Sequence, residues 1–566
     1  MGDEEQATPT LDAADMALVT ELGERRQVRE GEYLYREGDA TNEFFVVVSA
    51  EVDIVVGVNG EERVIVSHGP GRFLGELNML SGLRVFVSAR VVRDGEVVAI
   101  SRDRLRQLMS TKPRLGDTIL AAFMARRGML MTGAAPSVRL IGSQFSPESL
   151  HIREFLTRTR IPHEWLDADH DLQVNALLGQ LNITATELPV VITTGTVLRR
   201  ATPGVVANYL GLTVESLPNR CFDLVVVGGG PAGLAAAVYG ASEGLSTLNV
   251  EMTAPGGQAG MSSRIENYLG FPMGVSGAEL TQRAIIQAEK FGASLTAPCM
   301  AVSLGQRAGH LIVQLSDGGE VAGRAVIAAT GASYRRLEAS RLSDFEGNGV
   351  FYAATEMEAR MCGTSPVVIV GGGNSAGQAA IFLSQNGCAV TLVIRGPDLA
   401  RDMSRYLIER IEADPNITLR AKTTVIALEG DETLRAIHLD GPDGTIVVPS
   451  AGLFSFIGAE PSSGWLNGCA ALDAEGFVPT DLSLSPEQLG SDWMSLDRLP
   501  LPFETSRPGL FAIGDLRSGS MKRVATAVGE GSASVRSVHR YLAFGPTPGA
   551  TAFSQPLTDV QEEVQS

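Results

Sequence analysis

The chain has 566 residues, of which 44% are hydrophobic and 20% charged, as is usual for soluble globular proteins. Its length predicts about three or four domains. The formal net charge of −19 disfavours binding to a nucleic acid or to an anionic membrane, because both carry negative charge themselves. The N-terminus lacks the basic stretch and apolar core of a signal peptide, and the longest apolar stretch, 222–240, is interrupted by glycines. We therefore expect a cytoplasmic protein with no nucleic-acid partner and no membrane partner.

The five cysteines are far apart in the sequence: Cys221, Cys299, Cys362, Cys388 and Cys469. An odd number without close pairs indicates neither a disulfide framework nor a zinc site. We predict reduced, mostly buried thiols and no metal site.

The first part of the chain, 11–131, is predicted to be a small β-roll followed by a helix. Short β-like runs separated by glycine, such as EFFVVVSAEVDIVVG and RVFVSARVV, precede a helical stretch at about 102–131. These runs, together with GRFLGELNMLSG, resemble a cyclic-nucleotide-binding domain. The resemblance implies that fold and makes a nucleotide a candidate ligand.

The phosphate-binding part of that domain is only partly matched. In the family a Gly-Glu pair begins the phosphate cassette, and an arginine pairs with the cyclic phosphate. Gly75 and Glu76 match the pair, but the arginine position aligns with Val85, and Arg84 lies one residue early. A shift of one residue in a β-region turns a side chain to the other face. We favour a degenerate regulatory or dimerisation module, and nucleotide binding stays open as the alternative.

Residues 137–213 alternate between strand and helix patterns, which predicts a compact α/β unit. The order resembles a glutaredoxin- or thioredoxin-like domain, including Pro189 before a strand, where such folds hold a cis proline. The segment FSPESLHIREFL places Ser146 and Ser149 where the family carries the two cysteines of a CPxC motif. A serine hydroxyl cannot exchange disulfides at neutral pH, so we favour a docking or structural role.

A first dinucleotide-binding pattern is FDLVVVGGGPAGLAAAVYGASEGLSTLNVE. It combines a strand, the GxGxxG spacing, a helix and a second strand that ends at Glu251. Gly228 allows a tight turn, Gly230 lets a pyrophosphate approach the backbone, and Gly233 lets helix and strand pack closely. The helix N-terminus faces the phosphates, and Glu251 can accept hydrogen bonds from the ribose hydroxyls.

The segment PVVIVGGGNSAGQAAIFLSQNGCAVTLVIRG repeats the plan with Gly371, Gly373 and Ala376. Arg395 stands where the first pattern has Glu251. A cation at this position suits a 2′-phosphate, so NADPH is favoured over NADH. Two such sites predict that one holds FAD and the other delivers a nicotinamide.

Residues 222–542 resemble the low-molecular-weight thioredoxin reductases in the segments GGQAGMSSRIENYLGFP, AATGASYRRL, PGLFAIGDLRS and ATAVGEGSASV. The resemblance implies a homodimer and two nested Rossmann-like domains, with FAD at 221–345 and 460–545 and NAD(P)H at 346–459. We expect a disordered tail at 546–566. The implied FAD contacts are Gly228, Gly230, Pro231, Ala232, Gly233, Glu251, Gly257, Gln258, Asn267, Thr330, Gly331, Gly514, Asp515 and Ala525. The implied NADP contacts are Gly371, Gly373, Asn374, Ser375, Ala376 and Arg395.

The redox cysteine pair of that family is absent. Alignment of the segment GVFYAATEMEARMCG on the family motif puts Ala353 and Glu356 at the two cysteine positions. Cys362 follows shortly, and we interpret it as a buried structural thiol rather than a catalytic one.

The sequence as a whole predicts an FAD-dependent oxidoreductase that passes hydride from NADPH to FAD. Because the cysteine pair is missing, we expect the next acceptor to be a small oxidant, a quinone or a ferredoxin-like protein. Two alternatives stay open. One is a thioredoxin-disulfide reductase that uses non-vicinal cysteines. The other is a regulatory protein that senses flavin and nucleotide without turnover.

Overall fold

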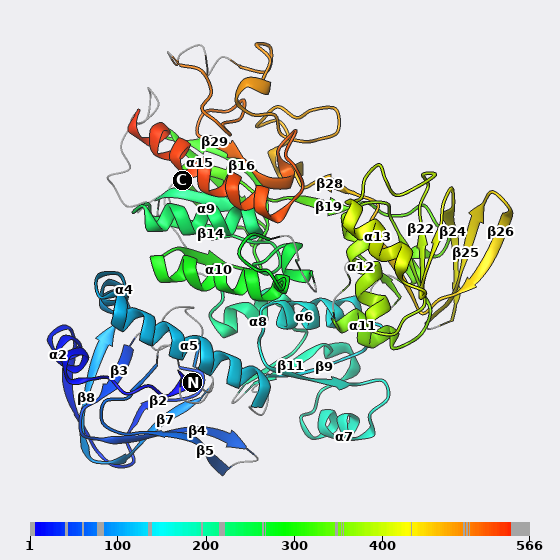
Figure 1. Cartoon of the computed structure of the whole chain (residues 1–566). Helices are drawn as coiled ribbons and strands as arrows, with labels where there is room; N and C mark the ends of the chain where they lie inside the picture. Colours follow the sequence, from blue (N-terminus) through cyan, green and yellow to red (C-terminus); the bar gives the residue numbers. More distant parts are fainter. Residues whose placement is uncertain are drawn as a thin grey trace, which may run out of the picture.

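The computed structural model describes residues 6–544 apart from 40–42, 59–60, 76–83, 86, 134–137, 194–195, 214–220, 263–264, 266–267, 346–348, 353, 355, 432, 491–492, 494–495 and 497. Several residues named above lie outside the described ones: Glu76, Asn267, Ala353 and the tail 546–566. The chain forms four units, of which the last is inserted into the third (Figure 1). None of the described helices combines the length and the apolar character needed to cross a bilayer.

The N-terminal module, which runs from α2 to α5, contains two four-stranded sheets, ordered β1-β8-β3-β6 and β2-β7-β4-β5. Its strands are β1 Glu24–Val28, β2 Tyr33–Tyr35, β3 Glu43–Val47, β4 Glu51–Val58, β5 Glu61–His68, β6 Phe73–Leu74, β7 Ser88–Arg93 and β8 Gly95–Ser101. Its helices are α2 Ala13–Leu22, α4 Arg102–Thr111 and α5 Pro113–Gly133. The expected single helix at 102–131 is thus two helices. Pro113 begins the second one, because its ring and missing N–H cannot continue the first.

Strand β3 explains how this module holds together. Phe44 and Val46 pack into the core shared with the helices, whereas Phe45 and Val47 pack into the core of the β-roll. Successive side chains of a strand point to opposite faces, so the run EFFVV is buried on both sides.

The middle unit, β9 to α8, has a four-stranded sheet ordered β10-β9-β11-β12, in which β9 and β10 are parallel and the other pairs antiparallel. Its elements are β9 Val138–Gly142, α6 Pro147–Arg158, β10 His163–Asp167, α7 Leu172–Gln180, η1 Ala185–Glu187, β11 Val190–Thr193, β12 Thr196–Leu198 and α8 Pro203–Leu210. The Leu188–Pro189 peptide is cis. Ser146 and Thr202 cap α6 and α8, each followed by a proline at the first helical position.

The first nucleotide unit is built on a seven-stranded sheet ordered β15-β14-β13-β18-β17-β16, with β29 also paired to β18. Its strands are β13 Cys221–Val227, β14 Thr247–Val250, β15 Ser294–Thr296, β16 Ala301–Arg307, β17 His310–Leu315, β18 Glu320–Ala328 and β29 Leu510–Ala512. Its helices are α9 Pro231–Ser242, η2 Ala259–Met261, α10 Gly277–Phe291, η4 Gly464–Leu466, η5 Asp481–Ser483, η6 Gly514–Leu516 and α15 Val524–Ala543. In Figure 1 α15, α9 and α10 lie in a row beside this sheet.

The second nucleotide unit has a parallel five-stranded sheet ordered β20-β27-β21-β22-β23 and an antiparallel sheet β24-β25-β26. Its elements are η3 Leu342–Asp344, β20 Val350–Phe351, α11 Glu356–Cys362, β21 Val367–Val370, α12 Asn374–Gln385, β22 Val390–Val393, α13 Arg405–Ala413, β23 Ile417–Arg420, β24 Thr424–Gly430, β25 Leu434–Gly441, β26 Gly444–Pro449 and β27 Gly452–Ser455. The chain leaves the first unit and returns to it through an antiparallel pair, β19 Ala332–Tyr334 with β28 Ala459–Pro461. The second unit is therefore inserted into the first.

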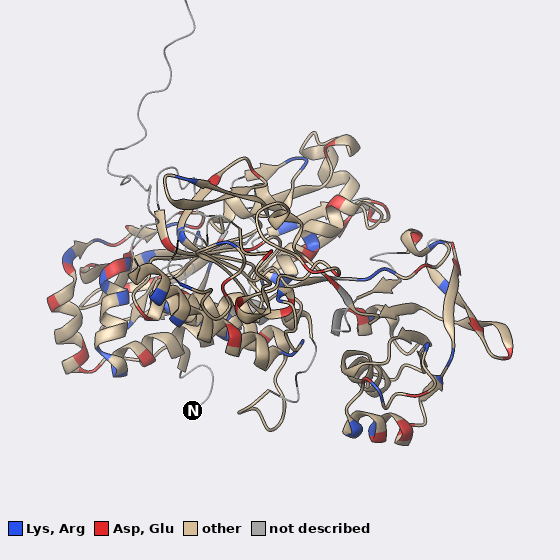
Figure 2. Cartoon of the chain, turned by 90° about the horizontal axis from the view of Figure 1, so that it is seen from above, with Lys and Arg blue, Asp and Glu red and all other residues tan. Residues whose placement is uncertain are grey.

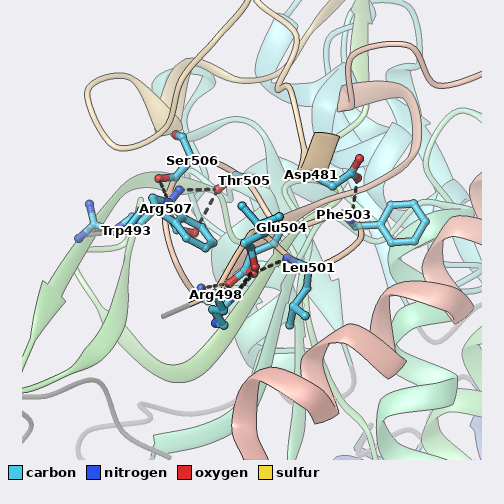
Figure 3. A network of polar contacts seen from close by, with 11 residues as sticks. Asp481, Trp493, Arg498, Leu501, Phe503, Glu504, Thr505, Ser506 and Arg507 are labelled. Carbon is cyan, nitrogen blue, oxygen red and sulfur yellow. Dashed lines mark hydrogen bonds and ion pairs between the residues drawn. The ribbon is translucent and has the colours of Figure 1, made fainter. Parts of the chain in front are cut away.

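A buried polar network fixes the long loop that precedes β29 (Figure 3). The Glu504 carboxylate is fully buried and accepts two hydrogen bonds from Arg498, of 2.6 and 2.8 Å. It also accepts from the backbone N–H groups of Leu501, at 2.8 Å, and Gly509, at 2.9 Å. Trp493 donates its indole N–H to the Ser506 carbonyl at 2.6 Å. Because every oxygen of the buried carboxylate is paired, the network favours one conformation of this loop.

Charged residues are mixed over the surface. In Figure 2 Lys and Arg are scattered among Asp and Glu rather than gathered along one element.

Candidate active site

The first glycine turn depends on the absence of side chains. Gly228 follows β13 with a φ of +111°, and a Cβ there would overlap the carbonyl oxygen of Ala329. A Cβ on Gly233 would overlap the carbonyl oxygen of Gly228. Both positions therefore require glycine, one for its backbone conformation and both for close packing.

The mouth of this turn is open where a phosphate would approach. Gly230 precedes α9, whose first turn has no side-chain cap, and Pro231 occupies the first helical position. A Cβ on Gly230 would meet nothing nearer than the Cα of Gly257, at 3.9 Å. The uncapped N–H groups and the helix dipole together suit a pyrophosphate, so these residues fit a dinucleotide.

Glu251 lies directly after β14 and is 9% exposed. It completes the first cradle, which we define as the turn Gly228–Gly233 together with Glu251. One carboxylate oxygen accepts from the Gly229 N–H at 2.6 Å, and the other accepts from the Thr253 N–H at 3.0 Å. A carboxylate oxygen can accept a second hydrogen bond, so the group remains able to bind ribose hydroxyls.

Segments far apart in the sequence meet around this turn. The Gly256 N–H donates to the Gly229 carbonyl at 2.7 Å, and Gln258 donates its side-chain amide to the Ala332 carbonyl. Thr330 donates its hydroxyl to the Ser462 carbonyl at 2.7 Å. A Cβ on Gly514 would lie 2.9 Å from that of Ala232. The structure thus gathers four of the segments in which FAD contacts are expected: Gly228–Gly233, Gly257–Gln258, Thr330–Gly331 and Gly514–Asp515.

A second buried carboxylate holds the turn at Asp515. Glu530 of α15 is 7% exposed and accepts from the Gly514 N–H at 2.7 Å. It also pairs with Arg517 at 2.6 Å and accepts from the Ser520 hydroxyl at 2.8 Å. Burial raises the pKa of Asp515, while the Lys522 ammonium opposes the shift and Glu530 adds to it. Ala525 lies in the first turn of α15, which packs against η6.

The second cradle has the same backbone plan. Gly371 follows β21 with a φ of +145°, and a Cβ there would overlap the carbonyl oxygen of Phe456. Gly373 precedes α12, which has no side-chain cap, and Ala376 is fully buried beneath that turn. A Cβ on Gly373 would meet nothing nearer than the Asp402 carbonyl oxygen, at 3.8 Å. A second phosphate-bearing ligand therefore fits here.

The polar residues of the second cradle are less enclosed. Arg395 lies two residues beyond β22 and is exposed, as is Ser375. The Asn374 side chain accepts from the Ser404 N–H at 2.6 Å, so it fixes the loop before α13. The sequence pattern gave no indication of this bond.

Cys362 is 4% exposed, at the C-terminal end of α11. Burial, with smaller contributions from Cys388 and Glu358, raises the pKa of its thiol to about 12. All five cysteines are free. A thiol held protonated in this way is a poor nucleophile, which supports the interpretation of Cys362 as structural. The side chain of Glu356, at the second cysteine position, lies outside the described residues.

The positions compared with family motifs in the two modules before residue 221 carry side chains with structural contacts. Ser146 caps α6 by accepting from the Ser149 N–H at 3.2 Å. Ser149 is fully buried, and its hydroxyl has no hydrogen-bond partner among the described residues. In the N-terminal module Val85 is 2% exposed and belongs to the core of the β-roll. Arg84 donates to the Gly38 carbonyl at 2.9 Å. The side chain at the family's arginine position therefore serves packing.

Sequence reasoning missed the partner residues Glu530, which is buried, and Arg517 and Ser462, which are partly buried. Glu530 and Arg517 are hydrogen-bonded over a separation of 13 residues, and Thr330 and Ser462 over a separation of 132 residues. No local spacing marks such contacts.

Comparisons with known proteins identify two regions of the chain. Residues 222–531 match the family model described as pyridine nucleotide-disulphide oxidoreductase. Residues 25–112 match the model described as cyclic nucleotide-binding domain. The middle unit lies outside both matches, so its likeness to thioredoxin stays a prediction.

Curated relatives include the thioredoxin reductase of Treponema pallidum, which is 31% identical over 323 residues, or 57% of this chain and 97% of the relative. The thioredoxin reductase of Mycolicibacterium smegmatis is 33% identical over 327 residues, or 57% of this chain and 96% of the relative. Among solved structures, T. acidophilum thioredoxin reductase gives a TM-score of 0.51 at 26% identity, over 57% of this chain and 98% of that one.

Proposed function

The chain belongs to the pyridine nucleotide-disulphide oxidoreductase family, and from this premise we propose that it takes electrons from NADPH through FAD and delivers them to an acceptor that is not a disulfide. The acceptor class is a small oxidant, a quinone or a ferredoxin-like protein. We place FAD in the first cradle and NADPH in the second. Bound there, the two cofactors supply a hydride transfer from nicotinamide to flavin.

The chain's own residues would bind and orient these cofactors. The open N-termini of α9 and α12 accept the two pyrophosphates. Glu251 binds a ribose of FAD, and Arg395 binds the 2′-phosphate of NADPH. Asp515, held by the Glu530 network, meets the ribityl chain of FAD. We further propose the domain limits 221–345 with 460–545 for FAD and 346–459 for NADPH, and a homodimer.

One observation supports the acceptor proposal above all. The two positions of the family's redox cysteines carry Ala353 and Glu356, and the nearest thiol, Cys362, is buried with its pKa raised to about 12. Without a thiolate, electrons cannot pass from the flavin to a protein disulfide by thiol exchange.

Rapid mixing of the purified protein with NADPH tests this function. We expect the flavin absorbance band to bleach, and turnover to continue when an artificial one- or two-electron acceptor is present. We expect no turnover with oxidised thioredoxin or a small aromatic disulfide. Steady reduction of either disulfide would contradict the proposal and favour the thioredoxin-disulfide reductase alternative.

A second candidate function is a sensor of flavin and nucleotide without turnover. The two modules before residue 221 favour this alternative, because they carry no redox cysteine and yet contact the rest of the chain. One such contact is the hydrogen bond from Arg158 of the middle unit to the Ala254 carbonyl. The same rapid-mixing experiment separates the two functions. A flavin that bleaches once, or not at all, in the presence of an acceptor would support the sensor.

A further inference from the structure

Helix α10 belongs to the first nucleotide unit but presents one face to the N-terminal module. Ile286 is 4% exposed and lies in the hydrophobic core formed by α2, α4, α5 and the adjoining strands. Glu289, three residues later and therefore on the same face, is 9% exposed. In Figure 1 α10 lies between α9 on one side and α4 and α5 on the other.

Three arginines of the N-terminal module lie near enough to the Glu289 carboxylate to act on it electrostatically. Arg102 and Arg106 come from α4, and Arg127 comes from α5; all three act electrostatically on Glu289. Helix α9, which packs on the other side of α10, carries no charged residue. Burial raises the pKa of Glu289 to about 7, against the attraction of the three arginines.

The other face of α10 holds the loop that approaches the first glycine turn. Thr281 packs against this loop, since a Cβ on Gly256 or Gly260 would lie 3.1 or 3.2 Å from its hydroxyl. The Gly277 N–H donates to the Ser262 carbonyl at 2.9 Å. Residues 256–262 are also bonded to the first glycine turn, because the Gly256 N–H donates to the Gly229 carbonyl at 2.7 Å.

The middle unit reaches the same segment. Arg158, at the end of α6, donates to the carbonyl of Ala254 at 3.3 Å. The middle unit also contacts the N-terminal module, because the Arg84 N–H donates to the Leu210 carbonyl at 3.0 Å. The middle unit therefore contacts both the first nucleotide unit, at Ala254, and the N-terminal module, at Arg84.

We propose that α10 couples the N-terminal module to the loop 256–262, so that release of the module from the Ile286–Glu289 face loosens the loop that borders the first glycine turn. Two distinct places contact one helix, the module at Ile286 and Glu289 and the loop at Thr281. The consequence for flavin rests on the proposed function, but the loosening of the loop does not.

Hydrogen exchange of the full-length protein tests the coupling. Ile286→Ala removes apolar contact with the module, and we expect protection of α4, α5 and residues 256–262 to fall on the order of tenfold or more. Gln287→Ala is the control on the same helix, because Gln287 directly follows Ile286 and its side chain is exposed. It should change protection by about threefold or less.

Each outcome of that comparison decides something. Loss of protection in α4 and α5 with an unchanged loop would overturn the coupling. Unchanged protection in both segments would overturn the docking role of Ile286. Exchange reports on the loop whether or not flavin is bound, so a failure of the proposed cofactor would be seen separately, in the flavin content of the wild type.

The pH dependence of exchange gives a second, independent measurement. The pKa of Glu289 is raised from 4.5 to about 7 in the docked state, so its contribution to docking is complete below about 4.5 and is lost as the pH rises through about 7. After correction for intrinsic exchange rates, protection of α4 and α5 should fall as the pH rises from about 4.5 to about 7, and should change little above that. Glu289→Gln should abolish this dependence. Equal protection at both pH values in the wild type would overturn the role of Glu289.

Discussion

The two nucleotide units share a backbone plan and differ in how their polar groups are enclosed. In the first unit the carboxylates of Glu251, Glu504 and Glu530 are each 9% exposed or less and accept backbone hydrogen bonds. In the second unit Arg395 is exposed, and the side chains of Arg401 and Arg405 are 90% and 91% exposed. Preorganised buried groups favour tight retention of a ligand, whereas exposed cations suit one that exchanges. The difference agrees with the proposal that FAD stays bound in the first unit and that the nicotinamide nucleotide binds and leaves the second.

The largest effect is expected when a buried carboxylate of the first unit is replaced. Glu504→Gln leaves the Arg498 guanidinium, 13% exposed, without its charge partner, and we expect a loss of about 3–5 kcal/mol in unfolding free energy. The measurement is chemical denaturation followed by tryptophan fluorescence, to which Trp465 and Trp493 of this unit contribute. Glu409→Gln in the second unit removes an exposed pair with Arg405 and should cost at most about 0.5 kcal/mol. Similar losses for the two variants would contradict the contrast between the units.

A second pair of variants separates the two cradles. Gly228→Ala and Gly371→Ala each put a side chain at a positive φ and against a carbonyl oxygen, at a cost of about 2–3 kcal/mol of local strain. Gly228→Ala should yield protein depleted of flavin. Gly371→Ala should keep its flavin and lose bleaching by NADPH. The ratio of flavin to protein and the rapid-mixing trace check both, and depletion of flavin in Gly371→Ala would reverse the assignment of the cradles.

Arg395→Ala sharpens the assignment of the second cradle. Removal of one exposed cation that binds the 2′-phosphate should weaken NADPH binding about tenfold, or about 1.4 kcal/mol, and should leave NADH binding unchanged. Arg435→Ala, which removes an exposed cation from β25 of the same unit, serves as the control. The Michaelis constants for the two nucleotides give the result; an equal change for NADPH and NADH would show that Arg395 does not read the phosphate.

The smallest expected effect is that of Cys362→Ala. Because this thiol is buried and stays protonated, turnover with an artificial acceptor should remain within about twofold of the wild type. Cys388→Ala, another buried thiol, is the matched control. A loss of turnover confined to Cys362→Ala would restore the alternative of disulfide chemistry through non-vicinal cysteines.

Sequence reasoning succeeded where function depends on local spacing. The glycines at 228, 230 and 233 and the acid at 251 stand in the expected strand, turn and helix, because each is fixed by residues within one βαβ unit. It did not separate α4 from α5, although Pro113 marks the break. It also gave no account of Glu530, whose partner Gly514 lies 16 residues away on another element.

The modules before residue 221 show the same limit. The sequence alone determined that serines stand at 146 and 149 and a valine at 85, and residue identity decides which chemistry is available there. It also determined the two glycine cradles, through spacing within single units. Only the tertiary structure decided that Glu289 is buried within the electrostatic reach of three arginines and that α10 contacts both the N-terminal module and the loop 256–262. Burial and charge pairing between elements depend on how distant segments pack, and no local pattern encodes that.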